Sequence, residues 1–116
     1  MPSYQTNQDA IRHARELIDD GKFDDKTPWS EAAPSADDAN QEIDKDSFDE
    51  FTRWHLGINT DASEGTKGRY AFPYGDFKKV NRAALIHAKQ RASQNGHGQV
   101  EKAADEVLQY LDRKRS

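Results

Sequence analysis

Apolar residues recur at helical spacing in several segments of the chain. Intervals of three and four positions between apolar side chains form stripes that would lie on one face of a helix. We expect helices over residues 7–20, 36–44, 48–56, 77–94 and 99–112. The stripe of the last segment is the cleanest, and a helix of this length is only marginally stable alone in water. The last helix must therefore pack against another element.

The starts of these segments carry capping signals. Thr6 followed by Asp9, and Ser35 followed by Asp38, match the capping box, and Asp76 stands where the N-cap of the fourth helix is expected. Only a short link separates the last two helices, which favours an antiparallel hairpin. We expect this C-terminal hairpin to be the scaffold against which the other helices pack.

A long segment without helical period separates the third and fourth helices. At its end Tyr70, Phe72 and Tyr74 occupy alternate positions, which in an extended chain would place the three rings on one face. Pro73 argues against a central strand there. We therefore expect an aromatic-rich loop, with residues 69–77 forming an aromatic strap over the helices.

These elements predict an all-α fold, a small bundle of four to five helices in one domain over residues 1–116. The core would be thin, because Leu, Ile, Val and Phe together number 18 of 116 residues, although fourteen alanines extend the apolar count. Residues 22–34 should form an irregular connection. Residues 1–5 and 113–116 should be frayed ends.

The composition removes several classes of function. The chain has no cysteine, which excludes a disulfide framework, a thiolate zinc site and a thiol nucleophile. No apolar run approaches the roughly 18 residues of a membrane-spanning helix, and the first residues lack the apolar stretch of a signal peptide. We expect no membrane association and a cytoplasmic location.

Charge is divided unequally along the chain. Residues 1–64 hold 6 Lys/Arg and 16 Asp/Glu, a net of −10, whereas residues 65–116 hold 11 and 5, a net of +6. The two halves could attract one another within the fold, or the basic half could present a binding face. We favour attraction within the fold, and the second interpretation stays open.

Candidates for catalysis or metal binding are few. The four histidines have no zinc spacing, and the carboxylate clusters lack the central glycine of a calcium loop, so we expect no metal and no cofactor. His55 and His87 are expected to be buried, hydrogen-bonded histidines. There is no phosphate cradle, nucleophile elbow or redox signature. The interpretation as an enzyme stays open only if Tyr70, Tyr74 and these two histidines surround one pocket.

Basic and aromatic residues are interleaved in the second half. Cations beside stackable rings are typical of single-stranded nucleic-acid binding, although the rings could equally fill a small core while the cations face water or pair with the acidic half. We prefer this structural interpretation. The candidate binding residues are Lys67, Arg69, Tyr70, Phe72, Tyr74, Lys78, Lys79, Arg82, Lys89 and Arg91.

Two stretches of sequence carry a resemblance. Residues 67–85, KGRYAFPYGDFKKVNRAAL, and 88–92, AKQRA, look like the hallmark segment of a family of short, uncharacterised bacterial proteins. The segments around Trp29 and Trp54 are similar to the same family, and a shorter match resembles helical segments of phage- and prophage-associated proteins. The resemblance implies a compact helical unit and no catalytic residue.

The function that the sequence favours is a small non-enzymatic binding or regulatory module acting through contacts with a partner protein. The alternative is nucleic-acid binding through the basic helix 77–94 and the aromatic strap 69–77. The sequence does not identify the partner or the oligomeric state.

Overall fold

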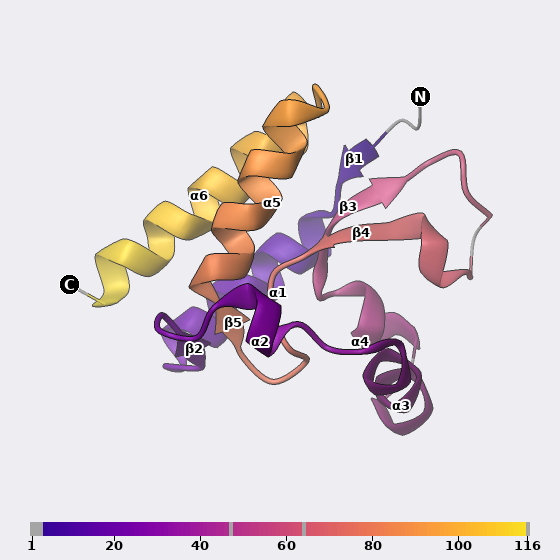
Figure 1. Ribbon diagram of the computed structural model, residues 1–116, viewed down its shortest axis with the longest axis horizontal. Helices are drawn as coiled ribbons and strands as arrows, with labels where there is room; N and C mark the ends of the chain where they lie inside the picture. The colour runs from indigo at the N-terminus through magenta and orange to yellow at the C-terminus, as the bar shows by residue number, and fades with distance from the viewer. Residues whose placement is uncertain (1–3, 47, 64, 116) are drawn as a thin grey trace.

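The computed structural model describes residues 4–46, 48–63 and 65–115, which form an α+β fold and not the all-α bundle expected from the sequence (Figure 1). Strands β1, β3 and β4 make an antiparallel sheet in the order β1-β3-β4, and β2 pairs in parallel with β5. The strands are β1 (Tyr4–Thr6), β2 (Phe23–Asp24), β3 (His55–Asn59), β4 (Tyr70–Pro73) and β5 (Val80–Asn81).

The helices lie around this sheet. They are α1 (Gln8–Asp19), α2 (Trp29–Ala32), α3 (Ala36–Asp46), α4 (Phe48–Thr52), α5 (Arg82–Gln94) and α6 (Gly98–Arg115), with a 3-10 turn η1 at Lys67–Arg69. Of the expected frayed ends, residues 4–5 lie in β1 and residues 113–115 lie in α6. Residues 1–3 and 116 are outside the described part. No helix of the described chain is both long and apolar enough to cross a membrane.

The predicted C-terminal hairpin is confirmed and forms the scaffold. Helices α5 and α6 run side by side in Figure 1, and α6 also packs against α1 and β1. Helix α3 and helix α4 lie beyond the sheet, away from α6 (Figure 1). The core residues are mostly those of the α1, α5 and α6 stripes together with the sheet: Ala10, Ala14, Ile18, Leu56, Tyr74, Val80, Leu85, Ala88, Val100, Ala104, Val107 and Leu111.

The expected helix over 48–56 is wrong in its second half, because the chain changes from helix to strand within it. The side chain of the buried Asn7 donates to the carbonyl oxygen of Thr52 at 2.9 Å and to that of His55 at 3.0 Å. Asn7 also replaces Thr6 as the N-cap position of α1. A side chain far away in sequence thus satisfies the carbonyls where α4 ends and β3 begins.

The expected capping box of α3 is confirmed. The backbone N–H of Asp38 donates to Ser35 Oγ at 3.1 Å, and the N–H of Ser35 donates to Asp38 Oδ2 at 3.0 Å. Two otherwise unpaired backbone donors are satisfied reciprocally.

Helix α5 begins five residues later than the expected 77–94. Asp76 Oδ1 accepts hydrogen bonds from the backbone N–H groups of Lys78 at 3.0 Å and Lys79 at 2.9 Å, so this side chain closes a turn and caps no helix. Phe77 has a positive φ of 68°, which an α-helix does not accommodate.

Asn81 is the true N-cap of α5. It is 1% exposed, its Oδ1 accepts from the N–H of Ala84 at 2.9 Å, and its Nδ2 donates to the Thr27 carbonyl at 3.1 Å. Asn81 and the preceding Val80 form β5 and pair with β2, so the start of α5 is joined to the connection that carries α2.

Candidate aromatic groove

The three alternate rings of the expected strap do not share a face. Phe72 has a positive φ of 61°, which interrupts the alternation of a regular strand. Tyr70 packs beside Phe48 with ring centroids 5.8 Å apart, whereas the ring of Phe72 lies over Gly57, and Tyr74 points into the core. Residues 70–73 of the strap form strand β4, and the rings at positions 70, 72 and 74 lie in three different environments.

Tyr74 is a structural residue. It is 0% exposed, its ring stacks on Trp54 at 5.3 Å, and its hydroxyl donates to the Arg53 carbonyl at 2.8 Å. His13 Nδ1 lies 2.9 Å from the same hydroxyl oxygen and, with that hydroxyl proton already used, is its donor. Burial raises the pKa of Tyr74 well above its ordinary value.

The expected basic residues are dispersed. Lys67 donates to Asn40, Arg69 to the Ala62 carbonyl, and Lys78 and Lys79 lie exposed in the turn after Asp76. On α5, Arg82 makes a bidentate pair with Asp112 at 2.9 and 3.1 Å, and Lys89 pairs with Asp105 at 2.9 Å. Of the ten candidate residues, the structure brings Phe72 and Arg91 together in one groove.

Charges of the two halves do meet within the fold. Lys114 pairs with Asp19 at 3.3 Å and Arg115 pairs with Asp25 at 2.8 Å. These contacts agree with attraction between the two halves, whereas Asp105 and Asp112, the partners of Lys89 and Arg82, belong to the basic half itself. The side-chain hydrogen bond from Arg82 is the main cause that lowers the pKa of Asp112 to about 2.

The groove that holds Phe72 and Arg91 lies between the three-stranded sheet, α2 and α5, and we call it the aromatic groove. Its cavity volume is about 520 Å³, within the usual range for a ligand pocket. The lining residues are Tyr4, Trp29, Ala71, Phe72, Pro73, His87, Ala88, Arg91, Asn95 and His97. Among these described residues none carries a carboxylate, in a chain with 21 Asp and Glu residues.

One wall of the aromatic groove is a cluster of rings. Tyr4 makes edge-to-face contacts with Phe72 at 5.3 Å and with His97 at 4.7 Å, and Phe72 contacts His97 at 6.0 Å. Gly57 makes this wall possible, because a Cβ there would lie 2.7 Å from the Phe72 ring. Trp29 lies half-buried on α2 and, within the described chain, has no ring packed against it.

The opposite wall is a polar row on α5. His87 and Arg91 lie on α5 and Asn95 is the C-cap residue of this helix, and their intervals of four residues place them along one side of the helix above the buried Ala88. His87 is exposed there, so its expected burial is wrong. The expected burial of His55 is confirmed, since this residue is 7% exposed and its Nδ1 lies 3.0 Å from the Phe51 carbonyl.

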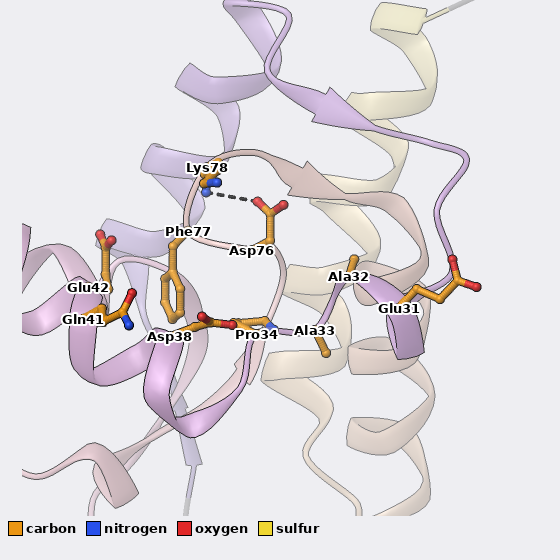
Figure 2. A pocket seen from close by; sticks show the side chains of 10 residues that line it. All are labelled: Glu31, Ala32, Ala33, Pro34, Asp38, Gln41, Glu42, Asp76, Phe77 and Lys78. Carbon is orange, nitrogen blue, oxygen red and sulfur yellow. Dashed lines mark hydrogen bonds between the residues drawn. The ribbon is translucent and has the colours of Figure 1, made fainter.

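A second hollow, of about 480 Å³, is acidic (Figure 2). Glu31, Asp38, Glu42 and Asp76 line it, and Figure 2 shows the Phe77 ring extending between the turn and α3. Asp38 takes part in the capping box of α3 and Asp76 closes its turn, whereas Glu31 lies on α2 and Glu42 lies within α3. The hollow therefore differs from the aromatic groove in both charge and ring content.

The four residues that the sequence offered for an enzyme do not surround one pocket. Tyr70 and His55 have ring centroids 6.3 Å apart, but Tyr74 lies in the core and His87 lines the aromatic groove. Within the described residues, no cluster of three His, Asp or Glu side chains could hold a metal ion.

Comparisons of this chain with protein-family models, with curated proteins and with solved structures found no match. The sequence did not indicate Tyr4, Trp29 or His97 as site residues, since they come from segments brought together only by the fold. The spacing of His87, Arg91 and Asn95 was the one local signal available.

Proposed function

We propose that this protein is a small binding module that acts through contacts with a partner protein and takes a short segment of that partner in the aromatic groove. The observation that carries the proposal is the groove's lining: a cluster of aromatic rings faces a row of polar side chains with no carboxylate among them. Concave surfaces of this kind, mainly aromatic with few polar groups, are typical binding sites.

Two further features support the aromatic groove as a binding site for a partner protein. Trp and Arg are the residue types most enriched at the energetic centres of protein interfaces, and Trp29 and Arg91 both line it. The positive φ of Phe72 is a strained conformation for a residue other than glycine, and such strain is concentrated at binding sites.

Nucleic-acid binding has weaker support. A single strand is followed by several cations along its phosphates, and the affinity depends on their number. Arg82 and Lys89 on α5 are paired with Asp112 and Asp105, and Lys67 and Arg69 bond to other groups of the chain. Arg91 alone of the expected cations lines the aromatic groove.

A display library of random peptides tests the proposal. We expect the immobilised full chain to enrich peptides that bind it, and we expect Trp29→Ala combined with Arg91→Ala to weaken that binding by at least about tenfold. Lys102→Ala, at an exposed position of α6 outside the groove, is the matched control and should bind as the wild type does. Circular dichroism establishes that each variant is folded. Failure to enrich any peptide, or equal binding by the groove variant, would refute the proposal.

A further inference from the structure

The polar row of the aromatic groove has the length of a short extended segment. His87 on α5 and Asn95, the C-cap residue of this helix, are eight residues apart, which corresponds to about 12 Å along the helix axis at a rise of about 1.5 Å per residue. An extended chain advances about 3.3 Å per residue, so about four residues of a partner could lie along this row.

Arg91 differs from the other cations of α5. Arg82 and Lys89 are neutralised by carboxylates of α6, at 2.9 Å in both pairs. Arg91 is exposed and lines the groove, and within the described chain no carboxylate forms an ion pair with it. Its guanidinium is thus available for a bidentate pair with an incoming carboxylate.

Aromatic surface lies on the other side of the same groove. Phe72 is half-buried within the ring cluster, and Trp29 presents its ring without a packed aromatic partner in the described chain. An aromatic or large aliphatic side chain of a partner could pack against both, removing their remaining exposed area from water. The groove therefore offers an apolar anchor site beside a cation.

We infer that the segment bound in the aromatic groove is extended and acidic, with an aromatic anchor next to a carboxylate that pairs with Arg91. This inference rests on the function proposed above and specifies the chemistry of the partner. A basic segment would place its cations against Arg91 in a lining that holds no carboxylate to receive them. A nucleic-acid strand would meet one permanent cation where it needs several.

Synthetic peptides test this chemistry on the full chain. Four fluorescein-labelled peptides share Gly-Ser flanks and carry the cores Asp-Phe-Glu-Phe, Asn-Phe-Gln-Phe, Lys-Phe-Lys-Phe and Asp-Ala-Glu-Ala, and fluorescence anisotropy measures their binding. We expect the acidic aromatic core to bind at least about tenfold more tightly than the neutral core, as for a charge-assisted pair. The basic core and the core without rings should bind more weakly still.

Charge reversal supplies the matched variants. Arg91→Glu should abolish the preference for the acidic core and favour the basic core, while Arg91→Gln should bind acidic and neutral cores alike. Lys102→Glu, an equal charge change at an exposed site on α6, should keep the wild-type order. The measurement is the order in which each variant binds the four peptides. A modest change in the stability of a variant would affect all four peptides alike and would not alter this order.

The outcomes separate this inference from the proposed function. Equal binding of the acidic and neutral cores, or an unchanged order in Arg91→Glu, would overturn the acidic partner while library-selected peptides still support peptide binding. If the protein binds no peptide at all, library-selected peptides included, both the acidic partner and the proposed function are overturned. Tighter binding of an oligodeoxythymidylate than of the acidic core would also overturn the inference and favour nucleic acid.

Discussion

Acid should destabilise this protein through one buried imidazole. Burial lowers the pKa of His55 from 6.5 to about 4, and its hydrogen bond with the Phe51 carbonyl opposes that shift only in part. Between pH 6.5 and pH 4 the unfolded chain binds a proton at this histidine that the folded chain does not bind. The free energy of unfolding therefore falls as the pH falls through this window.

The magnitude follows from the shift. A difference of one pKa unit corresponds to about 1.4 kcal/mol, so a lowering from 6.5 to about 4 corresponds to roughly 3 kcal/mol lost between pH 7 and pH 4. Burial also lowers the pKa of His13, which adds to the loss in the same direction. Asp24 and Asp112, with pKa values lowered to about 2, act in a separate window, where stability falls as the pH falls from about 4 to 2.

Urea unfolding at pH 7.5, 6.5, 5.5 and 4.5 measures the effect. His55→Asn keeps an amide donor near Nδ1 and cannot ionise, so it should be less stable than the wild type at pH 7.5 yet lose much less stability on acidification. Leu56→Val, at a buried neighbouring position, should cost about 1 kcal/mol at every pH and retain the wild-type slope. Parallel pH profiles for the wild type and His55→Asn would show that the buried imidazole is not the cause.

Two local substitutions test the packing. Gly75→Ala would place a Cβ against the Lys79 carbonyl and 2.6 Å from the Trp54 ring, so thermal unfolding should show a loss of about 3 kcal/mol or more in the free energy of unfolding. The control Gly98→Ala, with open space around its Cβ, should be neutral or slightly stabilising. Equal effects of the two would contradict the clash. Asn81→Ala removes both the cap of α5 and a buried donor and should cost about 2 kcal/mol, with Asn81→Ser milder because it retains a capping oxygen; no loss in urea unfolding would contradict this role.

Signals within a short stretch of sequence predicted the helices that are determined by residues close together in the chain. The stripes of α1 and α6 and the Ser35–Asp38 box are confirmed, because periodicity and capping act within a few residues. The sheets were missed for the opposite reason. The change from α4 to β3 depends on Asn7, more than forty residues away, and β5 depends on pairing with β2.

Two of the ten expected binding residues line the aromatic groove. Arg91 and Phe72 were among the expected binding residues, but their neighbours in the aromatic groove come from β1, α2 and the α5–α6 link. His87 was assigned to the core because its position fits the apolar stripe of a helix starting at residue 77. The buried face of α5 is formed by Ala84, Leu85, Ala88 and Ala92, and His87 lies beside this face in the polar row.

The strained backbone at Phe72 lies between the core and the aromatic groove. A regular strand would place Phe72 and Tyr74 on the same face, whereas the left-handed backbone at Phe72 sends one ring over Gly57 and the other into the core. Such a conformation costs about 1 to 3 kcal/mol and persists only where the surroundings fix it. The buried stack of Tyr74 on Trp54 and the hydroxyl's bond to the Arg53 carbonyl fix it from one side. The aromatic wall of the groove is thus held in place by the same interactions that stabilise the core.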